Sequence, residues 1–154
     1  MKKLILFMVF ALSGNFLMSQ TTEDYIEILR SVLKTEKKAA IAEEMNFTEQ
    51  EASVFWPLYN EFNEKMYNVQ SKRVKLIQDY IDHYGNMTDD KADELWTALI
   101  KYREETTSLT KQYYKKFRKI LPAAKAVKYF QAENKIAALI DYELAVEIPM
   151  IETD

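Results

Sequence analysis

The scarcity of helix-breaking residues constrains the fold of this chain more than any other feature. Its 154 residues include two glycines and three prolines, and one glycine, Gly14, lies in the N-terminal apolar segment. β-Hairpins and sandwiches need turn residues at short intervals, whereas long helices need few breakers. The sequence therefore predicts an all-α fold with long helices.

Three breaks divide the chain beyond its N-terminal segment. At the first, residues 46–48, Thr48 can cap the following helix and Glu51 completes a capping box. At the second, Gly85 stops one helix and Thr88 caps the next. At the third, Pro122 can occupy a first helical position. We expect four helices, at about 22–45, 49–84, 89–120 and 122–148.

A heptad pattern runs through the second and third expected helices, with Ala52, Tyr59 and Met66 among its apolar positions. Such helices joined by a short turn should form a long antiparallel hairpin, in which Tyr59 belongs to the core. The longer helix would span roughly 50 Å at about 1.5 Å per residue. Pro57 lies inside it and either kinks the axis or is tolerated near the helix start.

An elongated four-helix chain leaves apolar surface uncovered, and a symmetric homodimer would cover it. A closed monomeric bundle is the alternative. The candidate dimer surface combines a stripe on the first expected helix with apolar residues at the C-terminus: Tyr25, Ile28, Leu29, Val32, Leu33, Ile148, Met150 and Ile151.

Composition excludes several kinds of chemistry. The chain has no cysteine, so disulfides, thiol catalysis and cysteine-bound metals are excluded. It has one histidine, His83, and no Glu-x-x-His sequence, which argues against a catalytic triad and a helix-bundle di-metal site. A net charge of −3 gives no support for nucleic acid as a partner. We expect a protein that is not an enzyme, with no catalytic residues, no cofactor and no metal site.

The N-terminus has the pattern of a secretory signal peptide. Lys2 and Lys3 precede an apolar run, and small or polar residues lead to Ser19. We expect a signal peptide at 1–19 and a single all-helical domain at 20–154, with cleavage nearer Ala11 or Ser13, or an uncleaved anchor, as alternatives. The mature protein is then periplasmic and has no membrane span.

Two helix starts carry a family likeness: Phe47-Thr48-Glu49-Gln50-Glu51 and Leu121-Pro122-Ala123-Ala124-Lys125. In its layout and in these segments the chain resembles the Spy/CpxP group of periplasmic stress proteins, whose hallmark is Leu-Thr-x-x-Gln, seen twice. The motif-like residues here are Phe47, Thr48, Glu51, Leu121, Pro122 and Lys125. The first copy has Phe and Glu for the motif's Leu and Gln; the second has Pro for Thr and Lys for Gln. The resemblance implies a curved helical homodimer that binds unfolded proteins without ATP, or that restrains an envelope stress sensor.

Residues 111–119 interleave basic and aromatic side chains. They could grip unfolded polypeptide, or the cations could complement the C-terminal dipole of the third expected helix. Tyrosine suits adaptable binding because its large face orders at low entropy cost. The candidate protein-binding surface comprises Tyr67, Tyr113, Tyr114, Lys115, Lys116, Phe117, Arg118 and Tyr129.

Two functions remain open at this point. One is a Spy-like, ATP-independent chaperone or holdase for unfolded or envelope proteins. The other is an envelope-stress or metal-response regulator that docks on the periplasmic domain of a membrane sensor. The second would use Lys115, Lys116 and Arg118 for a single saturable partner.

Overall fold

A computed structural model describes residues 22–151, with side chains described for Ser31 and for residues 33–151. The expected signal peptide lies outside this range, as do the side chains of Tyr25, Ile28, Leu29 and Val32 from the expected dimer surface.

Within the described range every regular element is helical, which confirms the expected all-α fold. The elements are α2 (Thr22–Met45), α3 (Glu49–His83), the short 3₁₀ helix η2 (Tyr84–Asn86), α4 (Asp89–Ile120) and α5 (Ala123–Glu147). Their bounds lie close to those expected from the sequence. α3 continues through Pro57 without interruption.

The chain divides into two compact units, residues 1–38 and 39–154, and the boundary falls inside α2. The described part of the first unit is the helical stretch 22–38, in which Leu33 is exposed. The second unit contains the end of α2 and all of α3, α4 and α5.

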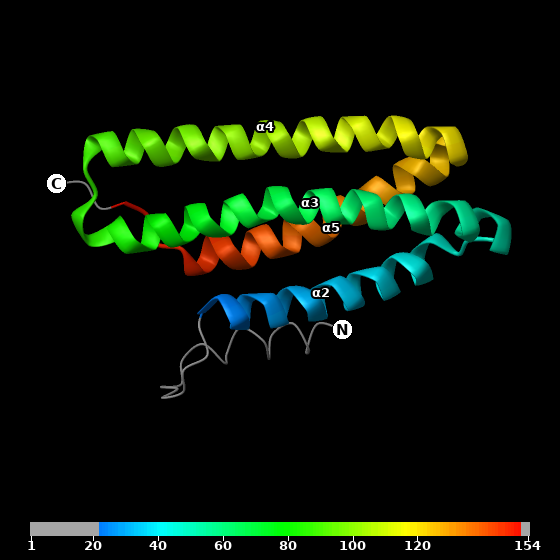
Figure 1. Cartoon of the computed structure of the whole chain (residues 1–154), viewed down its shortest axis with the longest axis horizontal. Helices are drawn as coiled ribbons and strands as arrows, with labels where there is room; N and C mark the ends of the chain where they lie inside the picture. Colours follow the sequence, from blue (N-terminus) through cyan, green and yellow to red (C-terminus); the bar gives the residue numbers. More distant parts are fainter. Residues whose placement is uncertain (1–21, 152–154) are drawn as a thin grey trace. The chain divides into compact units, whose positions relative to one another are not determined.

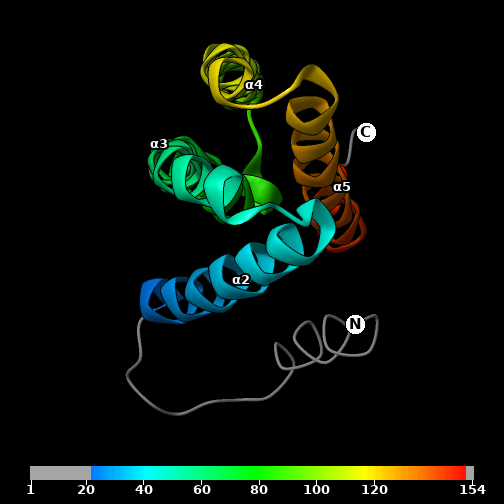
Figure 2. The same cartoon turned by 90° about the vertical axis from the view of Figure 1, so that its right-hand side faces the viewer.

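α3 and α4 pack side by side as an antiparallel hairpin, as the heptad pattern predicts, and η2 joins them (Figure 1). α5 then turns back from the end of α4. Viewed along the helices, α3, α4 and α5 lie at the corners of a triangle (Figure 2). α5 approaches α4 near the turn that joins them, and no close backbone contact with α3 is found among the described residues.

The predicted caps form. The Thr48 side chain accepts a hydrogen bond from the Glu51 amide at 3.2 Å, and the Thr48 amide donates to Glu51 Oε2 at 3.0 Å. This is the complete capping box. Thr88 caps α4 by accepting from the Lys91 amide at 3.2 Å. Pro122 is the N-cap of α5 rather than its first helical residue. The helix therefore begins at Ala123, one residue later than expected.

The first turn depends on an asparagine. Asn46 has a φ of 43°, in the left-handed region that asparagine tolerates better than most residues. Its amide donates to the Ala42 carbonyl, which closes the end of α2. Gly85, the expected glycine stop, lies instead within η2 and has no positive φ, so its turn does not require the freedom of glycine.

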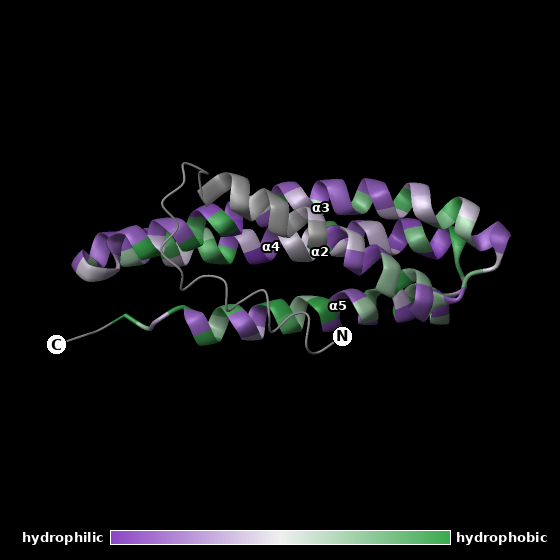
Figure 3. Ribbon diagram, turned by 90° about the horizontal axis from the view of Figure 1, so that it is seen from below, coloured by the Kyte–Doolittle hydropathy of each residue, from purple (hydrophilic) through white to green (hydrophobic). Residues whose placement is uncertain are grey.

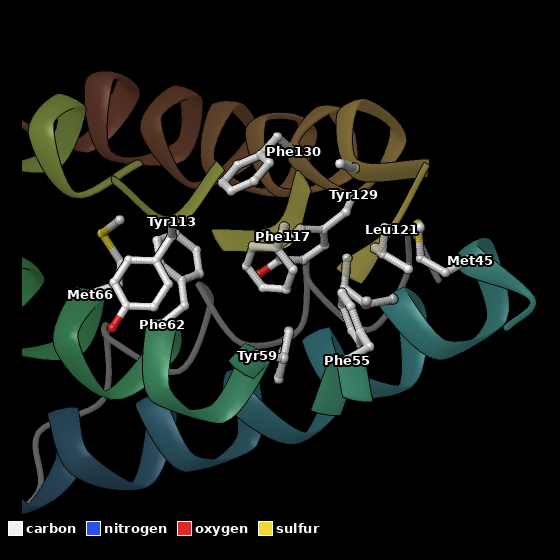
Figure 4. Close-up of a cluster of buried hydrophobic side chains, with 12 residues drawn as sticks. Met45, Phe55, Tyr59, Phe62, Met66, Tyr113, Phe117, Leu121, Tyr129 and Phe130 are labelled. Carbon is white, nitrogen blue, oxygen red and sulfur yellow. The ribbon is translucent and has the colours of Figure 1, made fainter. Parts of the chain in front are cut away.

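The core of the second unit is aromatic and lies at one end of the three helices (Figure 4). Phe117 of α4 is fully buried and packs against rings from both neighbouring helices. Its ring centroid lies 5.3 Å from that of Phe55, 4.7 Å from that of Tyr129 and 5.7 Å from that of Phe130. The buried cluster contains Ile41, Met45, Phe55, Tyr59, Phe62, Met66, Tyr113, Phe117, Leu121, Ala126, Tyr129 and Phe130. Tyr59 is thus a core residue, as predicted.

Packing is uneven along the helices. The stretch of chain between Met66 on α3 and Tyr113 on α4 contains the η2 end of the hairpin. Leu95 is the one buried hydrophobic residue in this stretch. Beyond Phe130, no residue of α5 is buried in the described range. Buried side chains are therefore concentrated at the end of the unit where α4 meets α5, and few lie toward the η2 end of the α3–α4 hairpin.

Replacing Phe117 with alanine should lower the free energy of unfolding by about 3–5 kcal/mol, because it removes a fully buried ring and leaves a cavity among four others. Urea unfolding followed by circular dichroism measures this change. Trp96→Ala is the control, since Trp96 is 60% exposed and its loss should cost less than about 1 kcal/mol. Equal losses in the two variants would contradict the location of the core.

Candidate functional site

The motif-like residues from the two helix starts meet in one place. Lys125 Nζ of α5 donates to Glu51 Oε1 of α3 at 2.6 Å and lies 5.9 Å from the centre of the Phe47 ring. Phe47 packs on the buried cluster, and Leu121 lies inside it. Although they are 74 positions apart, the two segments together join the α2–α3 turn to the start of α5.

Glu51 holds this junction together electrostatically. Its hydrogen bond from Lys125, with a further contribution from the Thr48 amide, lowers the pKa of the Glu51 carboxyl below its ordinary value. The carboxylate therefore serves both the cap of α3 and the contact with α5. A second contact lies nearby, where Lys128 on α5 reaches Glu44 at the end of α2 at 3.1 Å.

The expected binding surface is corrected by the structure for three of its aromatic residues. Tyr113, Phe117 and Tyr129 are fully buried, and their rings pack against Phe62 or Phe55 of α3. They cannot offer a face to a partner in this fold. Tyr114 is half-buried against Phe130, with ring centroids 5.9 Å apart.

Tyr67 and the basic residues of the expected surface lie closer to solvent. Tyr67 is exposed, as is Lys115. Lys116 pairs with Glu61 at 2.7 Å, and Arg118 donates to the Leu121 carbonyl at 2.6 Å, at the C-terminal end of α4. The Arg118 contact is the complement to the helix dipole that the alternative interpretation of this segment predicted. The eight residues therefore do not form one continuous surface.

A concavity elsewhere in the second unit was not identified from the sequence. A groove of about 940 Å³ separates α5 from the α3–α4 hairpin, and it begins where the aromatic core ends, at Phe62, Met66 and Phe130. Aliphatic side chains from all three helices line it: Leu76, Ile77, Leu95, Leu99, Ile140, Leu144 and Ile148. Much of the length of α5 is hydrophobic (Figure 3).

Aromatic and polar groups complete the groove. Trp96, on α4, is 60% exposed at its margin, and Tyr80 and Tyr102 also line it. Thr106 and Thr110 direct their hydroxyls to the α4 carbonyls four residues earlier, so they present methyl groups rather than free donors. Arg103 lines the groove and makes no ion pair within residues 31–151.

Two polar contacts connect the far half of α5 to α3 across the groove. Arg73 pairs with Asp141, and the Tyr80 hydroxyl donates to the Pro149 carbonyl at 2.7 Å. Arg73 also lies 5.8 Å from the centre of the Tyr102 ring, so it touches all three helices. Exposed ion pairs contribute little to stability, so these contacts hold α5 loosely.

No protein-family model, curated protein or solved structure matches this chain. Within the described residues, no helix has the length and apolarity to cross a membrane. The same residues contain no group of three or more acidic, histidine or cysteine side chains that could hold a metal ion.

Glu51→Gln should lower the free energy of unfolding at neutral pH. It should also make that free energy fall less as the pH is lowered. A carboxyl whose pKa is lowered by folding adds stability above its unfolded pKa, near 4.5, and loses it as the pH falls through the folded value. Urea midpoints measured between pH 7 and pH 3 should therefore fall less steeply in the variant.

Glu49→Gln is the matched control, because Glu49 lies in the same helical turn and makes no ion pair among the described side chains. A slope in Glu51→Gln as steep as in the parent chain would contradict the role given to this carboxylate.

Arg73→Gln combined with Tyr80→Phe should free the far half of α5 while changing the global free energy of unfolding by less than about 2 kcal/mol. Amide hydrogen exchange of residues 139–147 should accelerate several-fold, and that of residues 123–130 should not change. Lys72→Gln is the control, because it breaks an equally short ion pair to Glu105 within the packed hairpin. Uniform acceleration along α5 would argue against a locally weak attachment.

Proposed function

We propose that this chain is an exported, periplasmic protein-binding protein, an ATP-independent holdase that takes apolar segments of unfolded or stress-exposed proteins into the groove between α3, α4 and α5. The observation that carries this proposal is the groove itself, an apolar concavity of about 940 Å³ beside a packed core. Concave, mostly apolar pockets of this volume are the usual binding sites of soluble proteins.

The dimensions of the groove suit a polypeptide segment. Its α3 wall runs from Phe62 to Tyr80, about 27 Å at 1.5 Å per residue. That length accommodates five turns of an amphipathic helix, or roughly eight residues of extended chain. Helix-in-groove binding relies on an apolar face at such spacing, and the walls here supply aliphatic rather than hydrogen-bonding contacts.

The loose attachment of α5 supports adaptable binding. A holdase must accept segments of different bulk, so one wall of its site has to move at low cost. Here the far half of α5 is held by an exposed ion pair and one hydrogen bond, while its first turns are fixed in the core. Regions with few buried contacts are those that open at low free energy.

The resemblance to the Spy/CpxP group also supports the proposal. The two positions at which the group's motif has glutamine are Glu51 and Lys125 in this chain. These two side chains bind each other, so the two departures at the glutamine positions are explained by one opposite-charge pair. The signal-like N-terminus supplies the expected periplasmic location.

The alternative is a regulator that docks on the periplasmic part of an envelope sensor. The exposed Lys115 favours it, but Lys116 and Arg118 already make contacts within the chain. Charge reversal at these three positions would abolish capture of one saturable partner from an envelope extract. Capture of many unrelated proteins, unaffected by the reversal, would favour the holdase.

A charge placed in the groove should abolish holdase activity. Ala137 lines the groove, whereas the neighbouring Ala138 does not, and both are exposed on α5. Ala137→Lys should remove most of the delay that equimolar protein imposes on the aggregation of a denatured client, measured by light scattering. Ala138→Lys should retain the delay, since it adds the same charge one residue away.

Absence of any delay by the parent chain across several clients would overturn the holdase proposal, and equal loss in the two lysine variants would overturn the groove as its site. Tryptophan fluorescence gives a direct readout of binding. Trp56→Phe leaves Trp96 as the single tryptophan, and its emission should shift to the blue as a client covers the groove margin.

A further inference from the structure

A second hollow borders the groove on α4. It has a volume of about 390 Å³, and side chains of α4 alone line it. Arg103 and Thr107 line both this hollow and the groove, so the two concavities meet at these residues. Ser108 and Lys111 line the hollow only. A largely polar hollow and a largely apolar groove therefore share one edge.

The hollow gathers hydrogen-bond donors that are not engaged by any described residue. Arg103 and Lys111 are exposed and make no ion pair among the described side chains. Thr107 and Ser108 make no hydrogen bond in the same part of the chain, whereas Thr106, beside them on α4, bonds to the carbonyl four residues earlier. Arg103, Thr107 and Lys111 are spaced by four residues on one side of the helix, so the two long cationic side chains can converge over the Thr107 hydroxyl.

The balance of charge in the hollow favours an anion. Glu104 is the one carboxylate among the residues that line it, against the two cations Arg103 and Lys111. A phosphate group can accept hydrogen bonds from a guanidinium, an ammonium and a hydroxyl at the same time. The donors of the hollow therefore match a phosphate.

From Arg103 toward η2 the lining of the groove carries no charge. Beyond the Arg73–Asp141 pair, every described residue that lines it is aliphatic or aromatic. Its aliphatic walls include Leu76, Ile77, Leu95, Leu99, Leu144 and Ile148. In the opposite direction, toward the aromatic core, the lining includes the polar Glu133 and Asn134. An apolar chain attached to a group at Arg103 therefore extends toward η2.

The uncharged part of the groove has the length of one acyl chain. On α4 it extends from Arg103 to Ala92, about 17 Å at 1.5 Å per residue. An acyl chain in one leaflet of a bilayer spans about 15 Å, half of a hydrocarbon core of roughly 30 Å. Trp96 lies between these two limits, so a chain in this position covers its exposed ring.

We propose that the groove and the adjoining hollow together bind a single-chain anionic lipid, an acylglycerol phosphate. Its phosphate accepts hydrogen bonds from Arg103, from Lys111 and from the hydroxyl of Thr107 or Ser108, and its acyl chain lies in the groove toward η2. This ligand differs in class from the polypeptide segments of the proposed holdase. The inference rests on the groove and not on holdase activity, so the two can fail separately.

Isothermal titration calorimetry of the purified protein with three matched probes tests the proposal. 1-Myristoylglycerol 3-phosphate carries phosphate and chain, 1-myristoylglycerol lacks the phosphate, and glycerol 3-phosphate lacks the chain. The complete probe, kept below the concentration at which it forms micelles, should bind with a Kd in the micromolar range. Each partial probe should bind at least tenfold more weakly, because it retains only one of the two attachments.

Three substitutions on α4 test the phosphate site. Arg103→Gln should weaken binding of the complete probe about tenfold, because it removes a charge-assisted contact, and should leave binding of 1-myristoylglycerol unchanged. Lys101→Gln is the matched control: it removes the same charge two residues away, and Lys101 lines neither the groove nor the hollow. Glu104→Gln should strengthen binding of the complete probe several-fold, because it removes the carboxylate from the hollow.

Fluorescence locates the acyl chain. In the Trp56→Phe variant the emission of Trp96 should shift to the blue with the complete probe and stay unchanged with glycerol 3-phosphate. Binding of glycerol 3-phosphate as tight as that of the complete probe would overturn the groove as the site of the chain.

Equal affinities for 1-myristoylglycerol and its phosphate, or equal losses in Arg103→Gln and Lys101→Gln, would overturn the hollow as the phosphate site. Circular dichroism checks that each variant keeps its helical content. Absence of binding by the complete probe would refute the lipid site while the holdase assays with the Ala137 and Ala138 variants still stand. Lipid binding without any protection of clients would refute the holdase alone.

Discussion

The aromatic cluster around Phe117 fixes α5 at one end, and the remaining features of the second unit follow from that. Phe55 and Phe62 of α3, Phe117 of α4, and Tyr129 and Phe130 of α5 hold the first turns of α5 against the hairpin. The helix leaves the turn at Leu121-Pro122 in a direction set by this contact. Its far half then stays apart from α3 and α4, and the apolar groove is the space that results. The aromatic core and the greater part of the groove thus lie toward opposite ends of the same three helices.

The sequence predicts the local elements well because local interactions determine them. Thr48 and Thr88 cap helices through their own side chains, and the heptad positions of α3 and α4 require only the neighbouring helix. The burial of Tyr129 and Phe117 could not be predicted from local interactions. It depends on where the third helix of the unit is placed, and the periodicity of one helix does not contain that information.

The groove was missed for a related reason. Its walls come from three helices, and the contacts that bridge it, Arg73 with Asp141 and Tyr80 with Pro149, join residues 68 and 69 positions apart. The sequence did contain one signal. The second half of α5 is apolar on more than one face, whereas a helix that packs against a single neighbour needs only one apolar face. The junction was the opposite case. Its residues were singled out by their motif-like spacing, and Glu51 and Lys125 carry opposite charges that already indicate contact.

The buried phenols of the core set an alkaline limit on the fold. Burial raises the pKa of the Tyr59, Tyr113 and Tyr129 hydroxyls well above the ordinary value of 10.0, with nearby Glu133 or Glu61 adding to the effect. In the unfolded chain the same hydroxyls ionise near that ordinary value. Above it the unfolded state binds fewer protons than the folded state, so stability falls with each further rise in pH. Loss of the packed end in alkali then appears as a cooperative step in phenolate absorbance, separate from the gradual titration of the exposed tyrosines.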